Sequence, residues 1–332
     1  MKKLQIFFLT FLFIFTSCNN VVKTNIMEKD MKLPSRIKGK YLNVFHQSPT
    51  GVPLNRAVLF IHGASFPSSL ASGFKIDGVS WIDNLTMAGY DVYALDFLGY
   101  GKSDRYDYMS KNYGKNNNIG TASDVVQDID IVLNFIRNNA KINKISIIGH
   151  SWGATVSALY ATLHSEKIDK LVLFAPFIQR KGQTEWDKPK ELYEDLTPNE
   201  RIAQFVSKIP KDKVMTLERD VIKKWGKEWL ESDPTSKLRI PHSVRFPSAW
   251  QVDLFNCWNG KSLFSPTKIE NSTLLIRGEW DTTFSFSDAE NLFKQLINVP
   301  NKRYVVIDKS THVMHLEKNR FKLFNEVKLF LK

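Results

Sequence analysis

Short runs of aliphatic residues recur along the chain, and segments with helical periodicity separate them. The runs lie at residues 57–61, 90–96, 144–148, 170–174, 273–276 and 302–307. Their nearly continuous apolar character is typical of parallel strands that are covered on both faces. These runs therefore predict the strands of a mostly parallel sheet, and further antiparallel strands are expected near residues 38–45.

Amphipathic helical patterns lie between these strands. The clearest covers residues 121–140, where apolar residues recur every three to four positions and Thr121 with Asp124 offers a capping pair. Similar patterns cover residues 79–88, 151–164, 287–296 and 316–331. Strand and helix in alternation predict a doubly wound α/β fold.

One long segment interrupts this alternation. No strand of the buried type occurs between residues 174 and 273, a stretch that is rich in proline and contains Trp186, Trp225, Trp229, Trp250 and Trp258. A structureless loop of that length is implausible inside a compact domain. We therefore predict a mostly helical cap insertion at 181–265 over the carboxyl edge of the sheet, with the core formed by 37–180 and 266–332.

The N-terminal residues have the pattern of an export signal. Lys2 and Lys3 precede an apolar stretch at 4–15 that is short for a membrane span, and Phe-Thr-Ser-Cys follows, ending at Cys18. This resembles a bacterial lipoprotein signal, although Phe15 stands where leucine is usual. The resemblance implies a signal peptide at 1–17, a lipidated Cys18, a polar tether at 18–36 and a membrane-anchored, exported domain. The alternative is an ordinary secretory signal.

Composition narrows the class of protein further. The 332 residues are 43% hydrophobic, enough for one substantial folded domain with an insertion. The net charge of +12 is spread along the chain, which favours a solvated surface over a nucleic-acid site. The two cysteines, Cys18 and Cys257, give no disulfide framework. No cofactor and no metal ion are expected.

Ser151 is the candidate nucleophile. Gly149-His150-Ser151-Trp152-Gly153 stands between a buried strand and a helix. In that context the glycines permit the strained turn that lifts a serine hydroxyl above the sheet, at a helix N-terminus that favours developing negative charge. The alternative is a small residue in an ordinary turn.

A serine hydroxyl needs a base, and the base needs an acid to orient it. Of the seven histidines, His312 follows the final strand in a loop, so we favour it over His315, which is expected to pack or cap the last helix. Asp281 follows the strand at 273–276 and is favoured over Glu279 because of its reach. The chain order Ser151, Asp281, His312 fits this α/β architecture.

An oxyanion site is expected after the first buried strand, in His62-Gly63-Ala64. Glycine lets the backbone turn there, so the amides of Ala64 and Trp152 can face a tetrahedral intermediate. The His62 ring itself is expected to be structural.

Five motifs in register, HGAS, DFLGYGKSD, GHSWG, GEWD and STH, resemble the α/β-hydrolase superfamily in its serine-nucleophile, capped branch. The likeness covers about residues 39–180 and 262–332. Ser151 replaces the carboxylate of the epoxide hydrolase and haloalkane dehalogenase branches. Proline iminopeptidases share Ser-Trp-Gly, but their proline-rich oxyanion loop is absent here.

The resemblance implies hydrolysis of small-molecule carboxylic esters through an acyl-enzyme on Ser151. The aromatic residues of the insertion favour apolar acyl or aromatic substrates, although tryptophans in helices are more often core residues. Hydrolysis of amides, thioesters or carbon–carbon bonds with the same residues stays open. A catalytically silent envelope-binding module is a further alternative.

Overall fold

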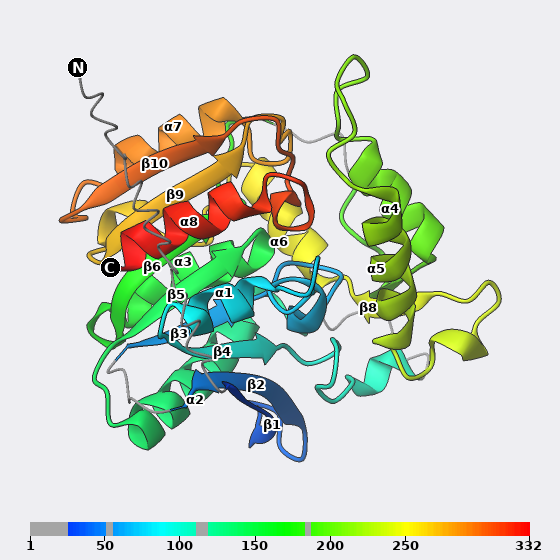
Figure 1. The fold of residues 1–332 in the computed structure, drawn as a ribbon, viewed down its shortest axis with the longest axis horizontal. Coiled ribbons are helices and arrows are strands. Elements are labelled where there is room, and N and C mark those ends of the chain that lie inside the picture. Colours follow the sequence, from blue (N-terminus) through cyan, green and yellow to red (C-terminus); the bar gives the residue numbers. More distant parts are fainter. Residues whose placement is uncertain (1–25, 51–55, 111–118, 183–186) are drawn as a thin grey trace, which may run out of the picture.

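The computed structural model describes residues 26–50, 56–110, 119–182 and 187–332. These residues form an eight-stranded sheet in the order β1-β2-β4-β3-β5-β6-β9-β10 (Figure 1). The strands are β1 (Ile26–Pro34), β2 (Tyr41–Pro49), β3 (Ala57–Ile61), β4 (Asp91–Asp96), β5 (Ile145–His150), β6 (Ile168–Phe174), β9 (Ser272–Gly278) and β10 (Lys302–Ile307). The expected signal at 1–17 and the lipidation site Cys18 lie outside the described residues.

The predicted fold class is confirmed. All strand pairs from β4 to β10 are parallel, and helices cover both faces of the sheet (Figure 1). These helices are α1 (Trp81–Met87), α2 (Ala122–Ala140), α3 (Trp152–Leu163), α7 (Phe286–Gln295) and α8 (Arg320–Leu331). Helix α2 begins as its sequence predicts, because Thr121 and Asp124 form a capping box. Strands β3 and β5 are buried along their whole length, as their aliphatic sequences require.

The sheet begins earlier than the sequence indicates. Residues 26–34, which we assigned to a polar tether, form β1 and pair antiparallel with β2, residue by residue. Most side chains of β1 are exposed, because an edge strand is held by backbone hydrogen bonds more than by burial. Its polar sequence therefore resembles a tether. Arg36, placed at the end of that tether, forms an ion pair with the buried Asp128 of α2.

The insertion is a cap that combines helices with a small sheet. It contains α4 (Pro198–Val206), α5 (Arg219–Glu231) and α6 (Ala249–Trp258). The antiparallel strands β7 (Tyr193–Leu196) and β8 (Val244–Pro247) were not expected, because each is only four residues long and neither is fully buried. Figure 1 shows α4 and α5 standing beside the edge of the sheet where the loops after β3 and β5 lie.

Two tryptophans of α5 attach the cap to the core. Trp225 and Trp229 are buried, and their indole N–H groups donate to the carbonyls of Leu70 and Ser65 at 3.0 and 2.9 Å. Their rings stack on each other with centroids 5.5 Å apart. These two side chains therefore serve as packing and docking residues, which is the more common role of tryptophan in helices.

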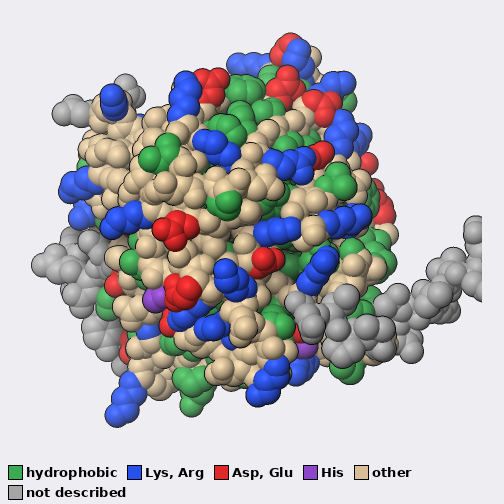
Figure 2. All heavy atoms as spheres, turned by 90° about the vertical axis from the view of Figure 1, so that its left-hand side faces the viewer, with side chains coloured by type: hydrophobic (Ala, Val, Ile, Leu, Met, Phe, Trp, Pro, Cys, Tyr) green, Lys and Arg blue, Asp and Glu red, His purple; other side chains and the backbone are tan. Residues whose placement is uncertain are grey.

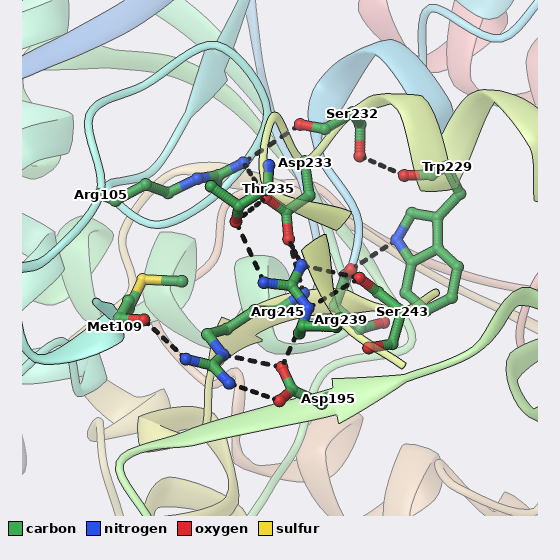
Figure 3. Close-up of polar contacts among 11 residues, drawn as sticks. Arg105, Met109, Asp195, Trp229, Ser232, Asp233, Thr235, Arg239, Ser243 and Arg245 are labelled. Carbon is green, nitrogen blue, oxygen red and sulfur yellow. Dashed lines mark hydrogen bonds and ion pairs between the residues drawn. The ribbon is translucent and has the colours of Figure 1, made fainter. Parts of the chain in front are cut away.

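An ion cluster centred on Asp233 also joins the cap to the core (Figure 3). Asp233 is buried and accepts hydrogen bonds from Thr235, from Arg239 and from the backbone N–H of Arg245. Arg105, from the loop after β4, approaches Asp233 at 4.0 Å and donates to the carbonyl of Ser232.

A second carboxylate extends this Asp233 cluster. Arg245 forms a two-pronged pair with Asp195 of β7, at 2.8 and 2.6 Å, and donates to the core carbonyl of Met109 (Figure 3). Burial opposes ionisation of Asp233, but hydrogen bonds from Arg245 and Thr235 outweigh it and hold the pKa of this carboxyl below its ordinary value.

Charged side chains of both signs are mixed on one face of the molecule. On the face drawn in Figure 2, Lys and Arg side chains are spread across the surface, with Asp and Glu side chains between them. In the part of the chain that the structure describes, no helix is long and apolar enough to cross a bilayer.

Candidate active site

Ser151 stands at a sharp turn between β5 and α3. Its backbone has φ 55° and ψ −125°, a strained conformation for a residue with a side chain. Gly153 makes the turn possible, because a Cβ at this position would lie 2.2 Å from the carbonyl oxygen of His62. The Ser151 N–H donates to the Phe174 carbonyl at 2.7 Å, which fixes the turn to the neighbouring strand β6. Strain held in this way is typical of a functional residue.

A continuous hydrogen-bonded chain runs from Ser151 to a buried carboxylate. The Nε2 atom of His312 lies 2.8 Å from the Ser151 Oγ, and its Nδ1 atom lies 2.8 Å from Oδ2 of Asp281. The other Asp281 oxygen accepts the backbone N–H groups of Thr283 and Phe284. Asp281 is only 3% exposed, so these bonds fix its orientation. The three residues come from loops after β5, β9 and β10, at the same edge of the sheet.

The two alternatives to these residues are engaged elsewhere. The Glu279 carboxylate accepts the backbone N–H of Lys309 at 2.8 Å, in the loop after β10. His315 is buried among Phe66, His150 and Phe174, and neither of its ring nitrogens has a hydrogen-bond partner in the described structure. Burial lowers the pKa of His315 to about 3. The His315 ring is therefore enclosed in the core, and the Ser151 hydroxyl contacts His312 instead.

The loop after β3 approaches Ser151 closely. A Cβ at Gly63 would lie 3.0 Å from the Ser151 Cβ and 3.1 Å from the His150 carbonyl oxygen, so a side chain here would crowd the elbow. The amides of Ala64 and Trp152 donate none of the hydrogen bonds found among the described residues. An oxyanion site requires donors that are not already engaged, and these two amides meet that requirement.

The His62 ring is structural, as its sequence position suggested. It is buried, with Nδ1 2.6 Å from the Gly63 carbonyl oxygen, and its Nε2 accepts the Phe97 N–H at 3.1 Å. The ring thus connects the loops after β3 and β4. Burial lowers the pKa of His62, which keeps the ring neutral.

Three supporting residues could not be identified from the sequence. His150 is buried, and its Nε2 lies 2.9 Å from the carbonyl oxygen of His312, which fixes the base loop beside the elbow. Burial, together with nearby His315 and His312, lowers the pKa of His150 well below its ordinary value. Glu317, also buried, holds the same loop through the Thr311 hydroxyl at 2.6 Å. The sequence places His150 inside the elbow motif and Glu317 a few residues after His312, but it does not indicate these contacts.

The third supporting residue, Asp253, connects the cap to the elbow. One oxygen of this buried carboxylate accepts the Trp152 indole N–H at 2.8 Å and the backbone N–H of Ala122 at 2.7 Å. Burial raises the pKa of Asp253 to about 7 despite these bonds. A cap residue thereby holds the side chain of Trp152, the residue directly after the candidate nucleophile. No sequence motif marks Asp253, because its partners are far away along the chain.

The chain belongs to the family described as alpha/beta hydrolase fold, whose sequence pattern matches residues 56–319. The match covers both the core and the inserted cap. It supports hydrolase chemistry, and the hydrogen-bonded serine, histidine and aspartate lie within the matched residues.

Individual relatives differ in their activities. A proline iminopeptidase of Neisseria gonorrhoeae is 32% identical over 143 residues, which cover 42% of this chain but only 37% of that protein. A putative 2-succinyl-6-hydroxy-2,4-cyclohexadiene-1-carboxylate synthase of Bacillus subtilis is 24% identical over 250 residues, 70% of this chain and 77% of that protein. An esterase structure from Exiguobacterium antarcticum superposes with a TM-score of 0.59 at 18% identity, covering 91% of this chain and 99% of the esterase. That likeness shows the fold alone.

Proposed function

We propose that this protein is a serine hydrolase that cleaves carboxylic esters through an acyl-enzyme on Ser151. The observation that carries the proposal is the unbroken hydrogen-bonded chain from the Ser151 hydroxyl through His312 to Asp281. The strained elbow and the two free amides of Ala64 and Trp152 complete the set of groups that acyl transfer needs.

The geometry supports a two-step reaction. His312 Nε2 takes the hydroxyl proton as the Ser151 oxygen attacks the ester carbonyl, and the amides of Ala64 and Trp152 stabilise the oxyanion. Collapse of this intermediate breaks the ester C–O bond, and the proton on His312 passes to the departing alcohol. Water then attacks the acyl-enzyme with His312 again as base, which releases the acid and restores the hydroxyl. Asp281 orients the imidazole and stabilises its charged form throughout.

A second candidate is hydrolysis of an amide bond after an N-terminal residue. Relatives named proline iminopeptidase match this chain, and the same three residues can cleave either bond. We favour esters because the loop at Gly63 to Phe66 lacks the proline-rich sequence of the iminopeptidases. Proline p-nitroanilide turnover that exceeds p-nitrophenyl butyrate turnover would reverse this preference.

A fluorophosphonate probe tests the proposal directly. The probe reacts with an activated serine, so we expect one adduct that maps to Ser151 by mass spectrometry. Ser151→Ala protein is the matched control and should not be labelled. A folded wild-type sample without an adduct would exclude the enzyme assignment in favour of a silent binding module.

We also propose that the domain is exported and anchored through a lipid on Cys18. The support is the signal-like sequence that ends at this cysteine. Labelled palmitate should be incorporated into the full chain in bacterial cells and should be lost in Cys18→Ser. Incorporation that persists in the variant would contradict the proposal.

A further inference from the structure

An unpaired arginine of the cap stands beside the oxyanion loop. Arg201 lies on α4, and its guanidinium carbon is 5.9 Å from the centre of the Phe66 ring and 4.8 Å from that of Phe205. Phe66 is the second residue after Ala64, and its ring lies 6.3 Å from that of His150. The guanidinium therefore faces the core across one aromatic ring from the nucleophile elbow.

The charge of Arg201 has no counterion in direct contact. Among the described residues no carboxylate lies within 4.0 Å of it, whereas Arg239 and Arg245 in the same cap are paired with Asp233 and Asp195. Its Nε is shielded from solvent and has no hydrogen-bond partner, and its Nη1 donates to Gln204 at 2.6 Å. A shielded N–H without an acceptor is costly, and an anion bound there would remove that cost.

Nearby groups do not fully compensate this charge. Burial lowers the pKa of Arg201 to about 10, against the attraction of Glu194 and Tyr100. Glu194 itself accepts a hydrogen bond from Gln251 at 2.7 Å, and burial raises its pKa. The arrangement is thus a cation whose Nε–H has no acceptor among the described residues, and the planar edge of a guanidinium suits the two oxygens of a carboxylate.

We infer that Arg201 binds a free carboxylate of the substrate, so that the preferred substrates are esters that carry a second, anionic group. This inference rests on the proposed function and narrows its substrate class. Arg201 acts here as a specificity residue, since the ester bond itself is cleaved at Ser151.

Matched ester pairs test this substrate class. The first pair is p-nitrophenyl glutarate, with a free carboxylate on the acyl side, and p-nitrophenyl valerate. The second is 4-carboxyphenyl butyrate, with the carboxylate on the alcohol side, and 4-carbamoylphenyl butyrate. We expect the wild type to show a higher kcat/KM for the anionic member of at least one pair. Preference for the neutral member of both pairs would overturn the inference.

Variants then assign that preference to one side chain. In Arg201→Gln the ratio of kcat/KM for the anionic to the neutral ester should fall by about 10- to 100-fold, because a charge-assisted hydrogen-bonded pair is lost. Arg201→Lys should restore part of the ratio. The control is Arg219→Gln, an exposed cap arginine, which should leave the ratio at the wild-type value. A purely structural stacking role would lower turnover of both esters equally and leave the ratio unchanged, and that outcome would refute the inference.

A binding measurement separates this inference from the proposed function. Glutarate itself should bind Ser151→Ala protein in calorimetry, and binding should weaken about 10-fold or more when Arg201→Gln is added. This readout needs no turnover. Equal glutarate binding with and without Arg201 would reject the inference even if Ser151 reacts with the fluorophosphonate. If Arg201→Gln weakens glutarate binding but fluorophosphonate does not label Ser151 in the wild type, the role of Arg201 is supported. Only the hydrolase assignment is then rejected.

Discussion

The site around Ser151 and the ion cluster around Asp233 both contain a buried carboxylate, yet they use it differently. One oxygen of Asp281 accepts hydrogen bonds from backbone N–H groups, and the other is hydrogen-bonded to Nδ1 of His312. The Nε2 atom of the same ring is hydrogen-bonded to the Ser151 hydroxyl. The oxygens of Asp233 accept hydrogen bonds from structural groups, among them the Arg239 guanidinium and the Arg245 backbone N–H. The Ser151 site can pass the hydroxyl proton through His312 to a bound reactant. The Asp233 cluster has no such group and can only hold its partners in place. The first should therefore control turnover, and the second should control how firmly the cap is attached.

The largest expected effect is on turnover. Ser151→Ala should lower kcat for a p-nitrophenyl ester by at least about 10⁴-fold, because no acyl-enzyme can form. Thermal unfolding should change little, since among the described residues the Ser151 hydroxyl is hydrogen-bonded only to His312. Stopped assays and calorimetry on the same sample measure both. A large fall in the melting temperature would show that the Ser151 side chain also supports the fold. The Ser151 site and the Asp233 cluster would then not differ as proposed.

Asp281→Asn should be nearly as severe. Asparagine can hold the imidazole only in the wrong tautomer and cannot stabilise its charged form, which costs about 10³- to 10⁴-fold in kcat. The matched control is Glu279→Gln, two residues earlier, whose carboxylate bonds Lys309 instead. If activity survives in Asp281→Asn and is lost in Glu279→Gln, the acid is Glu279 and our assignment of Asp281 is wrong.

Asp233→Ala should have the opposite profile. It removes the buried carboxylate that pairs with Arg239 and accepts the backbone N–H of Arg245, so the free energy of unfolding should fall by about 2–4 kcal/mol, measured in urea. Fluorophosphonate should still label Ser151 below the unfolding transition. Because the folded pKa of Asp233 is lowered, its contribution is present above the ordinary carboxyl pKa near 4. It is lost as pH falls through the folded value, so wild type should lose this advantage over the variant in acid.

The smallest effect should come from His315. Its folded pKa of about 3 lies below the ordinary value of 6.5, so the unfolded chain binds the proton first. The contribution to stability is full above pH 6.5 and falls steadily as pH decreases from there toward 3. The variant His315→Phe should reduce the loss of melting temperature between pH 7.5 and 5. An unchanged pH dependence would show that this ring is not the titrating group.

The sequence predicted the candidate catalytic residues of the core, but it did not indicate the polar cap residues that contact the core. Ser151, Asp281 and His312 each follow a strand whose aliphatic run is visible, and parallel strands bring their carboxyl ends to one edge. Arg201 and Asp253 could not be found in this way. Their contacts cross the cap interface to partners that are far away in the sequence.

The N-terminal boundary was wrong for a related reason. The polar sequence of β1 has few inward-facing apolar residues, and its membership in the sheet depends on pairing with β2. Strands β7 and β8 were missed because four residues give too little alternation to distinguish a strand from a loop.

The sequence by itself determined the fold class and the elbow, because aliphatic runs, helical periodicity and glycines act locally. Only the tertiary structure decided that His312 rather than His315 meets the serine, and that Asp281 rather than Glu279 meets the histidine. Residues two or three positions apart share nearly the same local signals. Which of them reaches the site depends on the direction of its side chain and on its burial, which are set when the strand ends and the cap come together.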